Sequence, residues 1–562
     1  MSGAGPTLRQ TSELYQRLFW LVGLMLGAML SACASDGAAD RASTVVDAQS
    51  ASHWADASLP EIAQAIDRGA VTSVALVQEY LRRIDSIDRA GPTLRSVLAI
   101  NPDALDRARE LDAMRSQGKS AGPLHGVPVL LKDNIEASGK LPTTAGSTAL
   151  VGNVTGRDSP LVAGLRNAGA IVLGKTNLSQ WANFRSSASM SGWSSLGGQV
   201  RNPHVLDRNP CGSSSGSGVA VAAGLAAGAV GTETNGSIIC PSTVNGVVGF
   251  KPTVGLLSAD YIVPVSFTQD TAGPMARSVR GAALMLDAMT HQSTQRPFSS
   301  ALDRASLSGV RLGVLRYSVG DHPGIKARFA EALTVLSQAG ATLIEIQTRQ
   351  PRPAGAQAMA RMILDVEFKH GLNAYLQNSP ADIPVRSLDE LIAYNRSAAE
   401  LEMVLFGQDI FIQSAATKGL DDPGYRSAVK TMTQSTRAEG IDALLDKHNL
   451  DALLFPSGPI ASAIDAINGD VWPSWVGDGA AAAVAGYPHI TVPMGMVRGL
   501  PIGLSFVASK DQDAKVLQLG YAFEQATKLR VAPQFLPTAV KLPVLERATS
   551  PVEEWGQSKV PE

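Results

Sequence analysis

The pattern of hydrophobic and polar positions predicts helices at the start of the folded region and a buried strand after them. From Leu59 onward, apolar side chains recur at helical spacing, and Ser73 is the expected N-cap of a second helix. Residues 103–116 have the pattern of a third helix. The apolar run 127–131 predicts a buried strand that ends at Lys132.

Strand and helix patterns alternate in the second half of the chain, which predicts an α/β fold. A long stretch in this half, residues 357–447, has mostly helical patterns. The strands predicted in this half are 310–315, 342–346, 451–455, 489–492 and 503–507, and the helices around them are 325–339 and 513–527.

The middle of the chain, residues 211–253, combines two serine clusters in glycine-rich turns with an apolar run between them. Ser213 and Ser237 each follow a glycine, so the backbone at both places allows close approach of a ligand. Residues 219–230 are apolar all round and predict a core helix that holds the two turns at a fixed separation. A hydroxyl beside consecutive backbone N–H groups suits a nucleophile with an oxyanion hole.

The N-terminal residues have the pattern of an export signal. Basic residues precede an apolar run at 18–30, which is too short to span a bilayer and ends in small residues. The next residues, Leu30-Ser31-Ala32-Cys33, resemble the lipobox of bacterial lipoproteins, in which the cysteine becomes a lipidated N-terminus. Cleavage by ordinary signal peptidase near Ala34 is the alternative. We expect export to the periplasm and a lipid anchor at Cys33 in the outer membrane.

Composition divides the chain into four parts. A lipoprotein-type signal peptide is expected at residues 1–32, and a polar tether of small residues at 33–58. One folded domain is expected at 59–535. The last residues, 536–562, are rich in proline and charge, which predicts a loose C-terminal tail.

Charge and cysteine content exclude several classes of protein. The net charge is −2 and no run of lysine or arginine occurs, so nucleic-acid binding is not expected. The three cysteines cannot form a disulfide framework and lack zinc-ligand spacing, so neither a metal nor another cofactor is implied. Whether Cys211 and Cys240 pair is left open, since a bond in an oxidising periplasm and free thiols are equally compatible with the sequence. Residues 169–176 satisfy the nucleotide-binding pattern G-x-x-x-x-G-K-[ST], but the intervening residues are themselves strand-like. We therefore expect a structural strand there.

Four segments together resemble the signature of the amidase signature family. They are Leu124 to Asp133, with the family's L-x-G-V-P-x-x-x-K-D pattern, the glycine-serine loop at 212–214, Gly231 to Ile238, and Gly246 to Thr253. The resemblance covers roughly residues 59–525 as one domain. It implies a mixed central sheet covered by helices on both faces, and a Ser-Ser-Lys triad with a cis peptide bond before the first serine. By position, the triad is Lys132, Ser213 and Ser237.

The resemblance also implies roles for these residues. Ser237 would attack a carboxamide carbonyl, Ser213 would relay protons to Lys132, and Ser214 would support them by hydrogen bonding. The oxyanion would be held by backbone N–H groups of the turn that ends at the nucleophile, namely Thr234, Asn235, Gly236 and Ser237. Lysine can act as a base only where burial lowers its pKa, and the buried end of a strand provides that burial.

Details of the signature are most similar to bacterial peptide amidases, which release ammonia from C-terminally amidated peptides. The chain departs from the commonest family form at Glu233, Asn235 and Ile239. Residues 177–194, with several aromatic side chains, are expected to lead toward the substrate pocket. The expected partner is a small-molecule or peptide amide, with no obligate protein partner.

Other functions compete with this hypothesis. The enzyme could hydrolyse other small acyl or aryl amides. It could be the amidotransferase subunit that makes glutaminyl-tRNA, although an export signal contradicts that role. It could be an exported serine esterase of the α/β-hydrolase type, which would require a strand before the G-x-S-x-G pattern at 212–216 and a histidine, with His489 the best placed. A non-catalytic binding protein with this fold would typically have lost a triad residue, and all are present.

Overall fold

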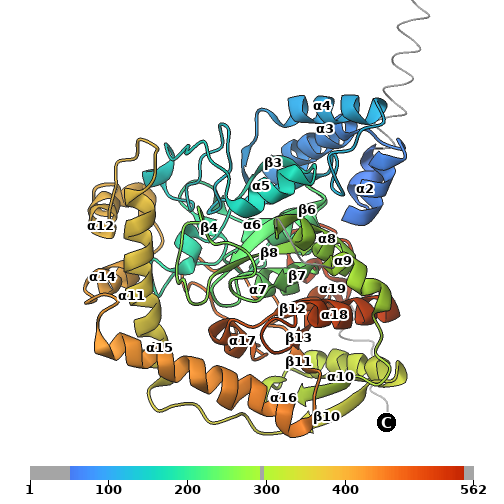
Figure 1. Cartoon of the computed structure of the whole chain (residues 1–562), viewed down its shortest axis with the longest axis vertical. Coiled ribbons are helices and arrows are strands. Elements are labelled where there is room, and N and C mark those ends of the chain that lie inside the picture. Colours follow the sequence, from blue (N-terminus) through green and yellow to red (C-terminus); the bar gives the residue numbers. More distant parts are fainter. Residues whose placement is uncertain (1–50, 291–296, 550–562) are drawn as a thin grey trace, which may run out of the picture.

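The computed structural model describes residues 51–290 and 297–549, and it confirms the α/β prediction (Figure 1). An eleven-stranded mixed sheet runs through the molecule. Its strands, in spatial order, are β1 (Val97–Ile100), β3 (Ile171–Thr176), β2 (Pro128–Lys132), β6 (Gly228–Glu233), β8 (Thr271–Ala276), β7 (Val248–Lys251), β12 (His489–Val497), β13 (Leu500–Val507), β11 (Ala452–Pro456), β9 (Arg311–Leu315) and β10 (Thr342–Ile346).

The sheet is parallel toward its two ends and antiparallel in its centre. β3, β2 and β6 are parallel neighbours, and so are β11, β9 and β10. Between these two groups, every neighbouring pair from β6 to β11 is antiparallel. The edge strand β1 is antiparallel to β3. A small separate hairpin is formed by β4 (Trp193–Ser194) and β5 (Gly198–Gln199).

Helices cover both faces of the sheet, as expected. Side chains of a strand point alternately to its two faces, so Val129 and Leu131 of β2 pack into one apolar cluster and Leu130 into another. One face is covered by α2 (Leu59–Asp67), α5 (Pro160–Asn167), α8 (Val279–Met289), α10 (Pro323–Gln338) and α18 (Asp513–Thr527). The other is covered by α4 (Ala104–Ser116), α6 (Ser215–Ala222), α7 (Ile239–Asn245), α16 (Asp442–His448) and α17 (Gly479–Ala485).

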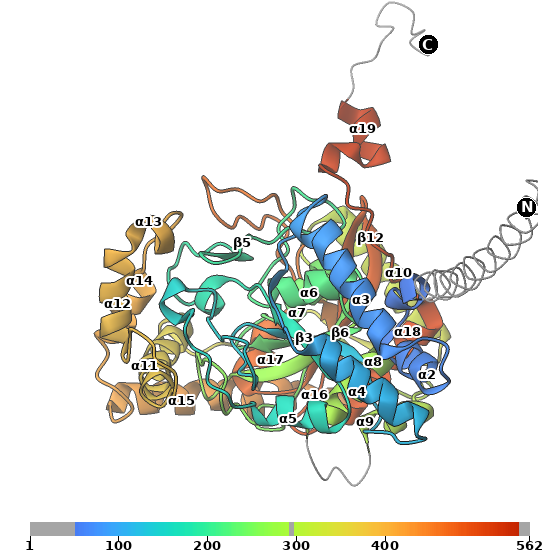
Figure 2. The same ribbon diagram turned by 90° about the horizontal axis from the view of Figure 1, so that it is seen from above.

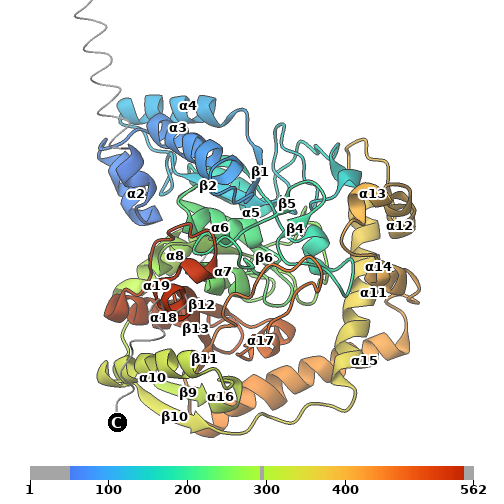
Figure 3. The same ribbon diagram turned by 180° about the vertical axis from the view of Figure 1, so that it is seen from behind.

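A group of helices between β10 and β11 lies along one side of the sheet, drawn yellow to orange in Figures 1 and 3. It confirms the helical pattern predicted for residues 357–447. The group consists of α11 (Ala356–Gln377), α12 (Leu388–Ser397), α13 (Ala399–Glu402), α14 (Asp409–Ala415), α15 (Pro423–Thr436) and the π-helical turn η6 (Arg437–Ile441).

Two local predictions are wrong. Helix α3 (Ser73–Arg83) begins at the predicted place, but Thr72 is its N-cap, because the Thr72 side chain accepts the N–H of Ala75. The apolar run 219–230 is not one helix, since α6 ends at Ala222 and the chain turns into β6. An all-apolar run has no period that separates a buried helix from a buried strand.

The folded unit is longer than the predicted domain. Residues 51–55 are helical, and Ala55 is fully buried beside Arg277, which donates to the carbonyls of Ala55 and Ala57. The part of the predicted tether from residue 51 therefore packs on the domain. The predicted tail likewise begins with the folded segments η7 (Ala539–Lys541) and α19 (Pro543–Thr549), the latter visible beyond the sheet in Figure 2.

The predicted signal peptide and the lipidation site Cys33 lie outside the described residues, as does the end of the predicted tail. The expected export and anchoring therefore stay predictions. Among the helices of residues 51–290 and 297–549, none is both long and apolar enough to cross a membrane.

Candidate functional site

Lys132 lies at the end of β2, as predicted, with its side chain wholly buried. It shares the face of the strand with Leu130, toward α6 and the glycine-serine loop. Its Nζ donates to Ser213 Oγ at 2.8 Å, to Thr232 Oγ1 at 2.8 Å and to the Thr232 carbonyl at 3.2 Å. The structure thus brings together two of the predicted site residues from positions far apart in the sequence.

Burial lowers the pKa of Lys132 to about 7, although the negative charges of Asp270 and Glu233 act in the opposite direction. At this pKa a substantial fraction of the amine is neutral near neutral pH. A neutral amine has a lone pair, so it can accept a proton from a hydroxyl within hydrogen-bond distance. Ser213 is that hydroxyl.

Asp133 does not hold the charge on Lys132, even though it is the next residue. Its carboxylate accepts the hydroxyl and the N–H of Thr144 and lies 3.7 Å from the ammonium of Lys175. Successive side chains at the end of a strand point to opposite faces, which separates the two neighbours. Lys175 therefore compensates Asp133, and Lys132 has no carboxylate in contact among the described residues.

The first serine loop is held tightly against β6. The peptide bond between Gly212 and Ser213 is cis, as the resemblance implied. Ser214 Oγ donates to the carbonyl of Thr232 at 3.0 Å and accepts the N–H of the same residue at 3.1 Å. These two bonds fix the Ser214 side chain against Thr232, and α6 begins directly afterwards at Ser215.

The second serine turn presents backbone N–H groups that the protein leaves unused. Within the described residues, no hydrogen bond is donated by the N–H groups of Thr234, Asn235, Gly236 or Ser237. Gly236 has a φ of +82°, a conformation that suits glycine. The turn is held from its far side, because Glu233 Oε2 accepts the N–H groups of Ile238 at 2.7 Å and Ile239 at 3.0 Å.

Ser237 is directly linked to the first loop through the backbone. Its carbonyl accepts the N–H of Ser214 at 3.1 Å, and its side chain is slightly exposed, at 8% for the residue. In the described part of the chain, no hydrogen bond joins the hydroxyls of Ser213 and Ser237. Catalytic hydrogen bonds are often longer in a free enzyme than in its substrate complex.

Ser237 opens onto a cavity of about 330 Å³. The two serine loops form its floor, and apolar side chains that include Phe184, Leu364, Trp472 and Trp475 form its walls. Asp470 is the charged residue among those that line it. The cavity can therefore hold a small, mostly apolar group next to the Ser237 hydroxyl.

The sequence revealed only part of this lining. Asn183 and Phe184 come from the predicted segment 177–194 and do line the cavity, whereas Trp181 and Trp193 are buried beside Phe411 and Phe406. The tryptophans at 472 and 475 come from a loop after β11, and no sequence pattern connects them to the serines.

Asp270 and Thr232 are functional neighbours that sequence reasoning missed. The Asp270 carboxylate accepts the Thr234 hydroxyl at 2.5 Å and the N–H groups of Val265 and Ser266. Burial raises the pKa of Asp270 to about 6. Thr232 directly follows Gly231 in the signature, so its place in that motif was the available signal.

The histidine required by the esterase hypothesis lies elsewhere. His489 is buried in the sheet, where its Nε2 lies 2.6 Å from Ser505 Oγ, and burial lowers its pKa to about 3. It is not among the residues that line the Ser237 cavity. The segment before Cys211 is also not a strand, so the nucleophile-elbow geometry is absent from residues 200–216.

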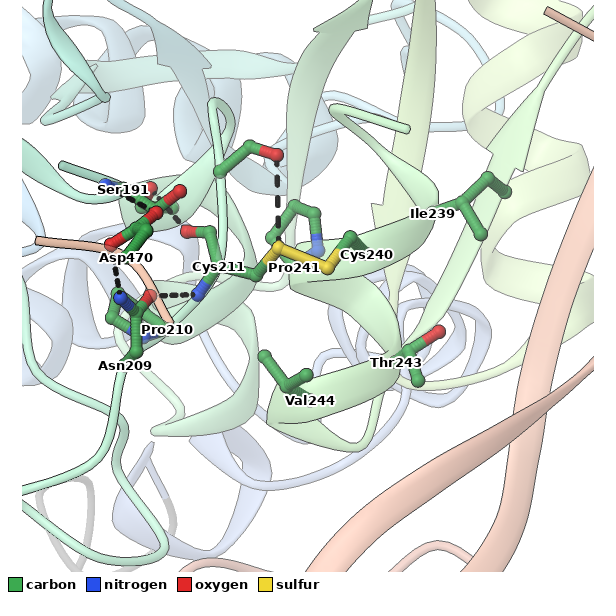
Figure 4. Close-up of a disulfide and its surroundings, with 12 residues drawn as sticks. Ser191, Asn209, Pro210, Cys211, Ile239, Cys240, Pro241, Thr243, Val244 and Asp470 are labelled. Carbon is green, nitrogen blue, oxygen red and sulfur yellow. Dashed lines mark hydrogen bonds between the residues drawn. A yellow bond between two sulfur atoms is a disulfide. The ribbon is translucent and has the colours of Figure 1, made fainter. Parts of the chain in front are cut away.

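Cys211 and Cys240 form a disulfide that connects the two serine loops (Figure 4). The sequence alone left this pairing open. The N–H of Cys211 donates to Asn209, whose side chain donates to Asp470, and Asp470 also accepts the N–H of Ser191. The disulfide therefore belongs to a network that fixes one wall of the cavity.

Removing this disulfide is expected to destabilise the protein. The double variant Cys211→Ala/Cys240→Ala should have a free energy of unfolding lower by about 3 kcal/mol, because the bond closes a loop with a sequence separation of 29. Denaturation in guanidinium chloride measures the difference, with dithiothreitol-treated wild type as the control. Alkylation of both cysteines in unfolded, unreduced protein would show that the bond is absent.

No cluster of histidine, cysteine or acidic side chains that could hold a metal ion occurs in residues 51–290 and 297–549. The groups that the site offers are the serine hydroxyls, the lysine amine and the backbone N–H groups. Ser237 and the N–H groups of its turn border one cavity, and the Lys132 amine is hydrogen-bonded to Ser213 in the neighbouring loop. Groups of this kind suit acyl transfer.

The chain is similar to known proteins over most of its length. The sequence model of the family described as Amidase matches residues 75–517. A probable amidase of Arabidopsis thaliana is 38% identical over 500 residues, which cover 86% of this chain and 92% of that protein. A glutamyl-tRNA(Gln) amidotransferase subunit of Symbiobacterium thermophilum is 33% identical, with 82% of this chain and 94% of that protein covered.

Solved structures show the same relation. The native peptide amidase of Stenotrophomonas maltophilia has a TM-score of 0.80 at 45% identity, over 86% of this chain and 99% of that one. An amidase family protein of Bacillus anthracis has a TM-score of 0.77 at 33% identity, over 86% and 94% of the two chains.

Proposed function

Because this chain belongs to the amidase family, and is thus a hydrolase of amide carbon–nitrogen bonds, we propose that it is a peptide amidase with a Ser-Ser-Lys triad. It would release ammonia from the C-terminal carboxamide of a peptide. The observation that carries the proposal is the 2.8 Å hydrogen bond between the buried Lys132 amine and Ser213, beside the Ser237 turn with its unused N–H groups.

The first step of the proposed reaction forms an acyl-enzyme. Ser237 Oγ attacks the carbonyl carbon of the carboxamide while its proton passes to Ser213, and the Ser213 proton passes to neutral Lys132. The carbonyl oxygen becomes an oxyanion that accepts N–H groups of the 234–237 turn. When the carbon–nitrogen bond breaks, the proton returns through Ser213 to the leaving nitrogen, and ammonia departs.

The second step returns the free enzyme. A water molecule takes the place of ammonia and attacks the ester carbonyl, while Lys132 again accepts a proton through Ser213. The bond to Ser237 Oγ breaks, Ser237 regains its proton, and the carboxylic acid leaves. The same pair of groups therefore serves as base and acid in both half-reactions.

Two observations favour peptide amides among the possible substrates. The chain is 45% identical to a peptide amidase over nearly the whole of that enzyme. The cavity beside Ser237 also has aromatic and aliphatic walls, which suit the side chain of a C-terminal residue. Hydrolysis of other small acyl or aryl amides is the alternative within the same chemistry.

A screen for ammonia release distinguishes these substrate classes. Purified protein is incubated with N-acetylated amino-acid amides, dipeptide and tripeptide amides, benzamide-type amides and fatty-acid amides, and ammonia is measured by a coupled assay. Peptide amides should have the highest kcat/KM, with the free carboxylic acid as the other product. A preference for benzamides or fatty-acid amides would contradict the peptide-amidase proposal.

The activity is expected to rise with pH. Since only the neutral amine of Lys132 can accept the proton, kcat/KM should increase as the pH rises through about 7 and level off above it. A profile of kcat/KM from about pH 5 to about pH 9 with one peptide amide measures this. A rate that is flat across this range, with the protein folded throughout, would contradict a lysine base.

Glu233→Gln provides a matched variant for this profile. Glu233 is one of the two carboxylates whose charge raises the Lys132 pKa, so its removal should move the rising limb to lower pH. Glu233 Oε1 is buried and has no hydrogen-bond partner in the described residues, so an amide nitrogen fits there. The other oxygen still accepts Ile238 and Ile239. A shift to higher pH would contradict this electrostatic explanation.

A further inference from the structure

A second cavity of about 330 Å³ lies between the sheet and the helices that follow β10. Figure 3 shows α16 and α17 beside strands β9 and β11, and residues from these elements and from α15 line the cavity. Asn235, from the Ser237 turn, lines both this cavity and the one beside Ser237. The turn that carries the unused N–H groups therefore borders both cavities.

The floor of the second cavity is apolar. It is made by side chains that are nearly or fully buried, among them Leu315, Leu444, Phe455 and Val507. They belong to one apolar cluster, which packs α16 and α17 on the sheet. A concave apolar surface of this size favours binding of an aliphatic or aromatic group.

Charged side chains lie at another part of the same lining. Arg349 and Arg352 contact the buried carboxylate of Asp478 at 3.0 and 3.5 Å, and Tyr317 donates to it at 2.9 Å. Arg349, Arg352 and Asp478 are the charged residues among those that line the cavity, so the lining has a net charge of +1. Each guanidinium has N–H groups beyond those in these contacts and is 41% or 58% exposed. They can therefore also bind an anion.

The side chains of Gln350 and Gln357 add uncharged donors to this lining. Neither has a hydrogen-bond partner among the described residues, and both border the second cavity. In the same part of the chain, Asn235 also has no partner for its side chain. Within the described residues, this chain therefore has an amide without a partner at the residue that borders both cavities.

We propose that the second cavity is an acyl-side subsite, which takes an apolar part of the substrate that carries a carboxylate. The proposal rests on the proposed peptide-amidase function. The residue that bears the amide would occupy the cavity beside Ser237, and the preceding residues would pass Asn235 into the second cavity. There the apolar side chains pack on the floor, and the anionic group binds Arg349 and Arg352.

The test compares peptide amides that differ only in length and in one charge. The series is X-Leu-amide, X-Leu-Leu-amide and X-Leu-Leu-Leu-amide, where X is either acetyl or succinyl, and succinyl supplies the carboxylate. In the wild type, one of the longer succinyl peptides should have a kcat/KM about tenfold above its acetyl partner, as expected for a charge-assisted hydrogen bond. The shortest pair should differ little.

Two variants identify the subsite. Arg349→Gln/Arg352→Gln should remove the succinyl advantage and leave hydrolysis of acetyl-Leu-amide unchanged. Ala360→Trp, which fills the second cavity from α11, should lower kcat/KM for the long peptides alone. Two results would overturn the subsite and leave the proposed function standing. One is that a variant lowers kcat/KM equally for the short and the long substrates. The other is that acetyl-Leu-amide is hydrolysed but no succinyl peptide of any length has a higher kcat/KM than its acetyl partner.

The affinity for the peptides tests the proposed subsite independently of hydrolysis. Calorimetry with Ser237→Ala and the best succinyl peptide should give a dissociation constant about tenfold lower than with its acetyl partner. Ala360→Trp in the same background should abolish that difference. Identical dissociation constants for the two peptides would overturn the subsite, whether or not the wild type hydrolyses amides. A wild type that hydrolysed no amide would refute the proposed function instead.

Discussion

Replacing Ser237 with alanine is expected to abolish ammonia release, with a fall in kcat of at least about 10⁵-fold. The hydroxyl of Ser237 opens onto the cavity at the end of the turn whose N–H groups are unused, whereas Ser213 is fully buried against Lys132. Without the Ser237 hydroxyl, no acyl-enzyme can form at this turn. Initial rates with the best peptide amide measure the loss.

Ser191→Ala is the matched control, because Ser191 lines the same cavity but belongs to neither serine loop. It should retain a kcat within about threefold of the wild type, in line with a residue that does not take part in the chemistry. Thermal unfolding confirms that both variants are folded. Residual activity of Ser237→Ala above roughly a hundredth of the wild-type rate would show that another group attacks the amide.

The second large effect is expected from Lys132→Met, which keeps the length of the side chain and removes the amine. Its kcat should fall by about 10³-fold or more, because Ser213 then has no proton acceptor within hydrogen-bond distance. The pH dependence should disappear together with the rate. Steady-state rates from about pH 6 to about pH 9 measure both effects.

Lys251→Met controls for the loss of a buried lysine. Lys251 is also fully buried, and its pKa is lowered by burial to about 8, but its Nζ donates to the carbonyl of Pro252. This variant should keep a kcat within about fivefold of the wild type. If Lys132→Met retained a near-normal rate at about pH 7, lysine would have no part in the mechanism.

The position of Lys132 could be predicted from the sequence for a physical reason. A short apolar run bounded by polar residues predicts a buried strand, and the first polar residue after it lies at the strand's end. The structure confirms the strand and the burial. The direction in which Asp133 points also follows from the alternation of side chains, once the strand is known.

Other parts of the site could not be predicted, because they depend on contacts between distant segments. Trp472 and Trp475 reach the cavity from a loop that follows β11, far along the chain from the serines. The second cavity is likewise assembled mainly from segments between residues 315 and 507. Burial of Ala51, Ala55 and Leu542 was missed because small or mixed polar composition resembles that of a linker.

The most direct test of the central claim is to identify the serine that reacts. Wild-type protein is treated with a fluorophosphonate, digested and analysed by peptide mass spectrometry, with Ser213→Ala and Ser237→Ala treated in parallel. We expect the label on Ser237, its absence from Ser237→Ala, and labelling of Ser237 in Ser213→Ala that is slower by about a hundredfold. A label on Ser213 or Ser214 of the folded wild type would contradict the assignment of Ser237 as the nucleophile.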